Sequence, residues 1–428
     1  MSDSQPPQPS MDHAVDPWAA LRVPNYRRFA VGFLTGSTGL QLLNATVAWE
    51  LYERTGDALV LGMVGLCRSL PVVLLALPAG HLADIRDRRI IVVCTQAAFA
   101  VVAMGFALLS YWQAPVWAYY LMLVASACVR AINGPARGSL LPLLVSDSIF
   151  ANVVTYQSGI FQAAAIGGPL LAGFLIQTLS GQGQTWAVYA IASACCALFA
   201  LAVLGTQPRK APPAKGTFTM TSMLAGLQHM WRERPIFAAI LLDLLAVLFG
   251  GATALLPVYA RDILHVDAIG YGALRAAPYV GALVVAAWLA FRPQFKRAGP
   301  VLLWSVGVYA LCIIAFGYST NMWLSLAALA ASGGADNVSV VIRHVLVQMR
   351  TPNHLRGRVG AVNSMFIECS NELGSFESGA VASLFTPVIS VVSGGVGTLV
   401  VIAGIALAFP QLRRLGRIRP LREPELEP

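Results

Sequence analysis

The sequence predicts an all-α, polytopic membrane protein whose helices form two related six-helix halves. Apolar stretches of about twenty residues, the length that a helix needs to cross a bilayer, recur between Phe29 and Pro410. Hydrophobic residues make up 57% of the 428-residue chain and charged residues only 11%, whereas soluble domains carry about 25% charged residues. The second half of the chain also repeats residues of the first at a nearly constant offset.

The apolar stretches are predicted to be helices. Lipid offers no hydrogen-bond partner to a backbone, so each stretch must close its hydrogen bonds internally, and these stretches are too long and continuous for barrel strands. We predict about twelve transmembrane helices, over residues 29–52, 58–80, 90–111, 115–136, 149–177, 185–205, 236–258, 271–291, 300–317, 322–342, 359–384 and 388–409.

The net charge of +9 follows a topological pattern. Lysines and arginines are concentrated in alternate connections, Arg343 among them, whereas the opposite loops contain only Arg54 and Arg261. By the positive-inside rule, both termini and the long middle loop are predicted to be cytoplasmic. The basic residues therefore indicate membrane topology, and no nucleic-acid partner is expected.

Polar segments divide the chain into five parts. Residues 1–25 are polar and proline-rich and lack the apolar core of a signal peptide, so they are predicted to be a disordered cytoplasmic tail. Residues 206–234 are predicted to be a cytoplasmic linker between an N-terminal half at 26–205 and a C-terminal half at 235–410. Residues 411–428 are predicted to be a second cytoplasmic tail.

No cofactor or metal site is expected. The seven cysteines lie within predicted helices without metal-ligand spacing, and the six histidines are scattered. No phosphate-cradling loop and no Ser, His and Asp constellation is present in the sequence, which disfavours both ATP as the energy source and an enzyme.

The offset between the halves indicates an internal duplication. At an offset of 207 residues the matched pairs are Tyr52 and Tyr259, Arg54 and Arg261, Gly65 and Gly272, Arg68 and Arg275, and Pro71 and Pro278. At an offset of 206 they are Arg137 and Arg343, Ser158 and Ser364, Gly168 and Gly374, and Gly173 and Gly379.

A duplicated six-plus-six bundle resembles the major facilitator superfamily, in which substrate binds between the halves near the midplane. After the second predicted helix, GHLADIRDRR is similar to the loop signature of that superfamily, although Ile85 and Asp87 depart from it. The resemblance implies a gating role for Gly80, Asp84, Arg88 and Arg89. Asp84 can accept hydrogen bonds at a cytoplasmic helix end and latch that side shut, and the alternative is a charge that only sets topology.

The fifth predicted helix contains a glycine-proline run that is similar to the signature of exporters in this superfamily. Its residues are Gly159, Gly168, Pro169 and Gly173. Glycines let helices approach closely, and a proline bends a helix and frees a carbonyl. The alternative is a tight helix crossing that has no bearing on the direction of transport.

Longer strings resemble the enterobactin-exporter branch of bacterial facilitators. The most specific are LLDLLAVLFGGATALLPVYARDIL at 241–264 and RGRVGAVNSMFIECSNELGSFESG at 356–379. The resemblance extends over essentially all predicted helices. It implies a proton-driven efflux carrier of the bacterial inner membrane with siderophore-like cargo; whether such a carrier has an outer-membrane efflux partner is left open.

Ionisable residues within apolar helices provide an independent indication of function. A charge at the centre of a helix costs about 2.5 to 3.5 kcal/mol on insertion scales, so each needs a partner or a function. The residues concerned are Arg68, Arg130, Asp243, Arg275, Asp336, Glu368 and Glu372.

Four of these residues are candidates for proton coupling. Glu368, Asn371 and Glu372 lie on one stripe of the eleventh predicted helix, where two carboxylates repel each other when both are ionised and so favour proton capture by one. The candidates are Glu372, Glu368, Asp243 and Asp336. The alternative for each is a carboxylate fixed by a neighbouring arginine or hydroxyl.

Polar residues on other helices are candidates for the substrate cavity. Arg130 and Asp336 occupy equivalent places in the two halves, so that Arg130 either pairs with Asp336 or receives an anionic cargo. The cavity candidates are Arg130, Gln41, Asn44 and Asn371. The sequence thus predicts proton-driven export of a siderophore-like molecule; the alternatives are multidrug or macrolide-like efflux and, much less favoured, a receptor that does not transport.

Overall fold

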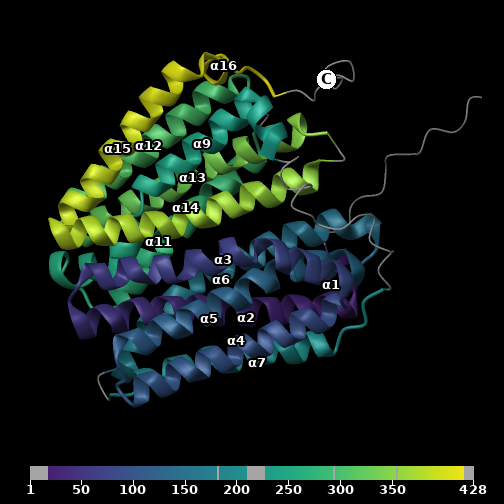
Figure 1. Cartoon of the computed structure of the whole chain (residues 1–428), viewed down its shortest axis with the longest axis vertical. Helices are drawn as coiled ribbons and strands as arrows, with labels where there is room; N and C mark the ends of the chain where they lie inside the picture. The colour runs from purple at the N-terminus through teal and green to yellow at the C-terminus, as the bar shows by residue number, and fades with distance from the viewer. Residues whose placement is uncertain (1–17, 181–182, 210–226, 293–294, 353–354, 419–428) are drawn as a thin grey trace, which may run out of the picture.

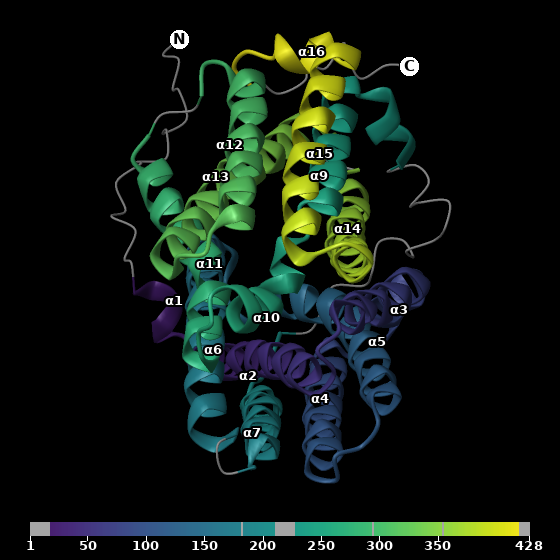
Figure 2. The ribbon, with the colours of Figure 1, turned by 90° about the vertical axis from the view of Figure 1, so that its left-hand side faces the viewer.

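A computed structural model describes residues 18–180, 183–209, 227–292, 295–352 and 355–418. The predicted N-terminal tail up to residue 17, most of the linker, and the end of the C-terminal tail lie outside the described residues. The described elements are helical. They form two bundles, the N half (α1 to α7) and the C half (α9 to α16), which lie one above the other (Figures 1 and 2).

The helices of the N half follow the predicted spans closely, with a few residues added at their ends. They are α1 (Ala19–Arg22), α2 (Pro24–Thr55), α3 (Ala58–Ile85), α4 (Arg88–Tyr111), α5 (Val116–Leu140), α6 (Phe150–Ser180) and α7 (Thr185–Leu204).

The C half repeats this arrangement and has short elements after its first long helix and after its last. Its long helices are α9 (Arg234–Phe249), α11 (Ala268–Ala290), α12 (Ala298–Tyr318), α13 (Met322–Arg350), α14 (Arg356–Leu384) and α15 (Pro387–Ala408). The short elements are η3 (Ala252–Leu255), α10 (Leu256–Val258), η4 (Tyr259–Ile263) and α16 (Pro410–Arg413).

The seventh predicted helix is interrupted, which differs from the continuous span expected over 236–258. α9 ends at Phe249, and Gly250 and Gly251 follow. A Cβ on Gly251 would lie 2.3 Å from the carbonyl oxygen of Gly374, so α14 approaches the backbone too closely for any larger residue. Figure 2 shows α10, which follows the break, at the seam between the halves.

Two helices extend beyond their predicted ends and take arginines into the bundle. Arg137 belongs to α5, where its guanidinium stacks over Phe33 at 4.7 Å, and Arg343 belongs to α13 and is buried. The prediction that Arg343 lies in a connection between helices is wrong. Its burial depends on Asp243 of α9, which lies one hundred residues earlier in the sequence.

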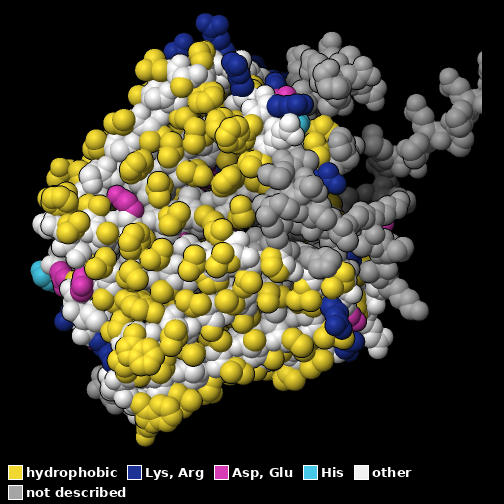
Figure 3. All heavy atoms as spheres, viewed as in Figure 1, with side chains coloured by type: hydrophobic (Ala, Val, Ile, Leu, Met, Phe, Trp, Pro, Cys, Tyr) yellow, Lys and Arg dark blue, Asp and Glu magenta, His cyan; other side chains and the backbone are white. Residues whose placement is uncertain are grey.

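The chain is a multi-pass membrane protein. Ten described helical segments are long and apolar enough to cross a membrane, and hydrophobic side chains cover most of the face in Figure 3. Two long helices, α2 and α14, are not among the ten segments, because their polar and charged side chains lower their mean hydropathy. The count of twelve transmembrane helices stays a prediction.

Equivalent pairs of helices pack against each other in the two halves, as the predicted duplication requires. In the N half α3 packs on α5, α4 on α5 and α7, and α2 on α6 and α7. In the C half the equivalent helices make the same contacts: α11 on α13, α12 on α13 and α15, and α9 on α14 and α15. The two largest contacts between the halves are also equivalent, since α3 packs on α14 and α11 packs on α6.

Matched glycines permit the close approach between the halves. A Cβ on Gly65 of α3 would lie 2.4 Å from the carbonyl oxygen of Glu372, and one on its counterpart Gly272 of α11 would lie 2.5 Å from that of Pro169. These glycines lie near the starts of α3 and α11, and we call this end of the bundle the closed end. We call the opposite end, at which α2 begins and α7 ends, the terminal end.

Hydrogen bonds between the halves also gather at the closed end. The Tyr52 hydroxyl donates to the Asp262 carboxylate, and Arg261 Nη1 donates to the carbonyl oxygen of Glu53 at 3.1 Å. The Tyr271 hydroxyl donates to the carbonyl oxygen of Ala45 at 3.2 Å. The halves are therefore sealed together at this end.

We predict that Gly272→Val opens the closed end. The added side chain meets the backbone of α6, and overpacking of this kind costs about 1 to 3 kcal/mol, which predicts roughly tenfold faster amide exchange in residues 259–272. Hydrogen exchange with mass spectrometry checks this in detergent-solubilised protein. Gly307→Val is the matched control, because a Cβ there has no neighbour within 4 Å. Equal exchange in the two variants would contradict the prediction.

Candidate functional site

A polar cavity of about 360 Å³ lies between the halves. It is lined from the N half by α2 and α3 and from the C half by α9, α11, α12, α13 and α14. The backbone at the break after α9, including Gly250 and Gly251, forms part of its wall. Irregular backbone at membrane depth is tolerated where it lines such a cavity.

The first charged group at the site joins the two halves. Arg130 of α5 contacts Glu368 of α14 at 2.8 Å and Glu372 of α14 at 3.6 Å. Arg130, which was predicted to line the cavity, and Glu368 do not belong to the cavity lining, whereas Glu372 does. Two arginines that line the cavity, Arg68 and Arg275, interact electrostatically with Glu372. We call these five residues the cross-half cluster. It contains three arginines and two carboxylates, so its ionised side chains leave one positive charge unmatched.

Helix geometry places the members of this cluster. Glu368 and Glu372 are four residues apart on α14 and so lie on the same face. The Glu368 side chain is 37% exposed, whereas that of Glu372, one turn further from the terminal end, is 14% exposed. Solvent therefore reaches the cluster from the terminal end.

The amide candidates take different positions. Asn44 lines the cavity and accepts a hydrogen bond from Arg68 at 2.8 Å, which fixes that guanidinium. Asn371 also lines the cavity, and its side chain donates to the carbonyl oxygen of Ile367 in its own helix. Gln41 does not belong to the cavity lining; its Cβ packs closely against Gly168 of α6.

The second charged group lies wholly in the C half. Asp243 of α9 forms a buried ion pair with Arg343 of α13, and Asp243 lines the cavity. Asp336 lies on α13 two turns before Arg343, lines the same cavity and interacts electrostatically with both members of the pair. Among the described residues, no direct ion pair or hydrogen bond is found for the Asp336 carboxylate. We call these three residues the C-half triad.

The C-half triad has an excess of negative charge, whereas the cross-half cluster has an excess of positive charge. Two carboxylates share one arginine, so the region is electrically balanced when one carboxylate carries a proton. One of the two options that the sequence offers for Arg130 is an ion pair with Asp336. In the structure Arg130 pairs with Glu368 and Glu372 instead. Arg343, the counterpart of Arg137 in the duplication, is the cation that the sequence did not assign to this site.

A buried carboxylate in the N half was missed by the sequence reasoning. Glu50 of α2 is 4% exposed and accepts hydrogen bonds from Ser110, Tyr119 and Tyr189 at 2.7 to 2.9 Å. Arg54 lies 3.7 Å away. The network ties α2 to α4, α5 and α7 beside the closed end. The only sequence signal was the spacing of Glu50 and Arg54 by four residues.

The loop motif after α3 makes contacts within the N half. Asp87 begins α4 by accepting a hydrogen bond from the Arg89 amide at 2.8 Å. The Arg89 guanidinium donates to the carbonyl oxygens of Val203 and Leu204 and so caps the end of α7. Gly80 lies within α3 and Arg88 is the first residue of α4. The Asp84 side chain lies outside the described part of the chain, so its predicted latch is untested.

The exporter-type run on α6 has a packing role in this conformation. A Cβ on Gly168 would lie 2.5 Å from Gln41 Cβ on α2, and one on Gly173 would lie 2.3 Å from the carbonyl oxygen of Ala268 on α11. Pro169 presents its carbonyl oxygen to Gly272 of the other half. Gly159 has open space around it.

The fold and the central cavity define a carrier of the major facilitator type. Three solved transporters share this fold: nucleoside transporter NupG (TM-score 0.69, 14% identity, 90% of this chain and 98% of that chain), a bacterial homologue of the lysosomal transporter Spinster (0.70, 16%, 91% and 98%) and a bacterial homologue of ferroportin (0.68, 17%, 93% and 100%). At these identities the likeness shows the fold alone.

The chain belongs to the transmembrane secretion effector family, whose match covers residues 15–426. Curated relatives include enterobactin exporter EntS of Shigella boydii serotype 4 and of Escherichia coli O1:K1. Each is 22% identical to this chain over 398 residues, which are 93% of this chain and 94% of the relative. The chain is therefore a transporter and not an enzyme.

We predict that single substitutions in the Asp243–Arg343 pair destabilise the protein strongly. Arg343→Gln leaves a buried carboxylate without its cation, which costs about 3 to 5 kcal/mol, whereas replacing both residues by apolar ones is close to neutral. Thermal unfolding of Arg343→Gln, Asp243→Asn and Asp243→Leu/Arg343→Met in detergent measures this. A double variant that melts below both single variants would show that the pair itself supplies net stability.

Proposed function

We propose that the chain exports a siderophore-like, amphipathic anion across the bacterial inner membrane by proton antiport and alternating access. The observation that carries the proposal is the opposite charge excess of two groups that both contribute residues to one cavity: three arginines against two carboxylates in the cross-half cluster, and two carboxylates against one arginine in the C-half triad. The first group can receive an anionic cargo and the second a proton, and antiport requires that the two bind in opposite orientations of the halves.

The arginines are suited to an anion that carries several oxygens. A guanidinium presents up to five donors in a planar fork and binds carboxylate or catecholate oxygens in pairs. Arg68 and Arg275 face the cavity beside the aromatic ring of Tyr279, which gives an amphipathic cargo an apolar surface as well. Arg130 can exchange Glu368 for a cargo oxygen, because both side chains are partly exposed.

Proton exchange is assigned first to Asp336. Glu372, Glu368 and Asp243 each have an arginine as a direct ionic partner, and Asp336 has none among the described residues. Protonation removes the excess negative charge of the triad, and release of the proton restores it. A carrier that binds cargo in one orientation and protons in the other converts the proton gradient into export.

The closed end and the expected topology support loading of cargo from the cytoplasm, which is the first step of export. With both termini cytoplasmic, the terminal end opens to the cytoplasm, and the partly exposed Arg130 and Glu368 lie on the path of cargo from that side. Opening of the other side requires the closed-end contacts of Tyr52, Arg261 and Tyr271 to break.

We predict that cells lacking this chain retain siderophore under iron starvation. Chromatography of cell and medium fractions measures the intracellular share, and expression of the intact chain restores secretion. Raised sensitivity to bulky apolar cations together with normal siderophore secretion would favour multidrug or macrolide-like efflux instead.

We predict that Asp336→Asn uncouples transport from the proton gradient. In reconstituted vesicles this variant exchanges cargo across the membrane but does not accumulate it when a pH gradient is imposed, because the triad no longer binds and releases a proton. Ser339→Ala, which changes another cavity-lining side chain of α13, is the matched control and keeps accumulation.

Glu372→Gln tests the alternative assignment in the same vesicles. It removes one partner of Arg130, so we expect altered cargo affinity with coupling retained. Wild-type accumulation by Asp336→Asn, or loss of accumulation by Glu372→Gln with normal exchange, would move the coupling role from Asp336 to Glu372.

A further inference from the structure

A second pocket, of about 540 Å³, lies at the terminal end of the C half, away from the central cavity. It is formed where α9 begins, α13 ends and the chain leaves α16. The residues that line it are Arg232, Glu233, Arg234, Pro235, Arg350, Gln411, Arg414, Leu415, Gly416 and Arg417. None of them takes part in the transport site described above.

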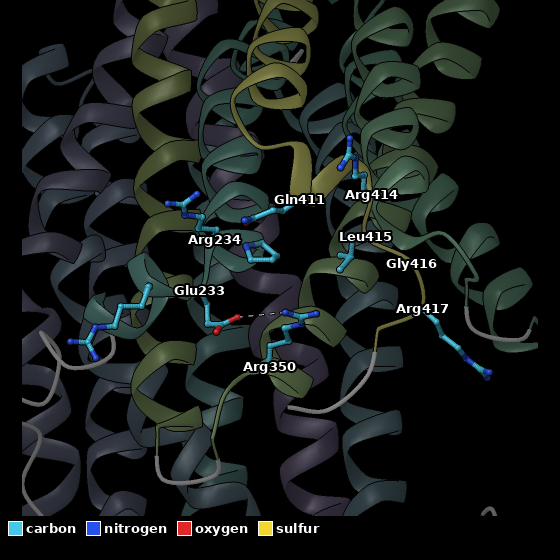
Figure 4. Close-up of a pocket in the computed structure, with 10 residues that line it drawn as sticks. Glu233, Arg234, Arg350, Gln411, Arg414, Leu415, Gly416 and Arg417 are labelled. Carbon is cyan, nitrogen blue, oxygen red and sulfur yellow. Dashed lines mark ion pairs between the residues drawn. The ribbon is translucent and has the colours of Figure 1, made fainter. Parts of the chain in front are cut away.

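The pocket is strongly basic. Five arginines line it against a single carboxylate, Glu233, which lies 3.7 Å from Arg350. Figure 4 shows Glu233 and Arg350 pointing toward each other and Gln411 reaching toward Arg234. The Arg350 Nε is buried and has no hydrogen-bond partner among the described residues. The arrangement leaves several guanidinium donors for a bound anion.

The surroundings of the pocket are those of a membrane interface. Trp231, which precedes the pocket residues, is 66% exposed, and its ring packs on Phe237, which in turn packs on Phe409. Tryptophan at the boundary between apolar surface and water is typical of the headgroup level of a bilayer. The pocket therefore adjoins the level at which phospholipid phosphates lie.

We propose that this pocket binds the phosphate-bearing headgroup of an anionic phospholipid. Arginine forks match phosphate oxygens, and basic pockets between transmembrane helices are suited to such headgroups. The lipid would hold together α9, α13 and the segment after α16 at this end of the C half. A free phosphate offers the same oxygens without acyl chains that can rest on Trp231.

The test is lipid binding by the full chain, measured by native mass spectrometry after purification in neutral detergent. Phosphatidylglycerol, phosphatidylcholine and inorganic phosphate are added separately. We expect phosphatidylglycerol to bind and Arg234→Gln/Arg414→Gln to bind it at least about tenfold more weakly, since each basic residue near an anionic headgroup contributes to affinity. The control, Arg297→Gln/Arg413→Gln, removes the same charge from exposed residues outside the pocket lining.

Several outcomes overturn the proposal. Equal loss in the two double variants would show only a general effect of charge, and equal binding of phosphatidylcholine would show no preference for an anionic lipid. Retention of inorganic phosphate without lipid would assign the pocket to a soluble anion. Residues 419–428 contain Glu423, Glu425 and Glu427, so a chain truncated after residue 418 is tested as well. If the truncated chain binds lipid and the full chain does not, residues 419–428 and not a lipid occupy the pocket in the full chain.

Discussion

The pairing of charges inside a lipid-facing bundle is the constraint on which the rest of this structure depends. A charge held at membrane depth needs a partner or a function, and where partners are present here they come from different helices. Arg130 meets its carboxylates across the interface between the halves, Arg343 meets Asp243 between α13 and α9, and Glu50 collects hydroxyl groups from three other helices. The polar side chains thus determine which helices line the interior.

The duplication explains how two halves can be both tightly joined and separable. Equivalent glycines bring α3 onto α14 and α11 onto α6, so the same type of contact occurs twice about the central cavity. The hydrogen bonds beside these contacts come from Tyr52, Arg261 and Tyr271. Repeated contacts of one type on both sides of a central cavity are the geometry in which two related halves can rock against each other.

The sequence predicts the fold well because lipid imposes a length and an apolar composition on every helix. The break after α9 was not predicted, since Gly250, Gly251 and Pro257 lie in an otherwise apolar run and the cause is the approach of α14. The site was predicted in part. Asp243, Asp336, Glu372 and Asn44 do line one cavity, as the cost of burying polar groups indicates. The roles of Arg343 and Glu50 could not be predicted, because both are near helix ends in sequence and acquire their partners only through tertiary packing.

The two charge groups both contribute residues to one cavity but differ in where their members lie. The cross-half cluster includes residues of both halves, whereas the C-half triad lies within the C half. Tyr309 stands at the break in α9, where its hydroxyl donates to Gly250 at 3.0 Å, and it interacts electrostatically with both Asp336 and Asp243. The irregular backbone after α9 leads into α10, which contacts α2, and into η4, which carries Arg261 and Asp262 at the closed end. The triad, the break after α9 and the contacts that join the halves are therefore neighbours in one continuous region of the structure.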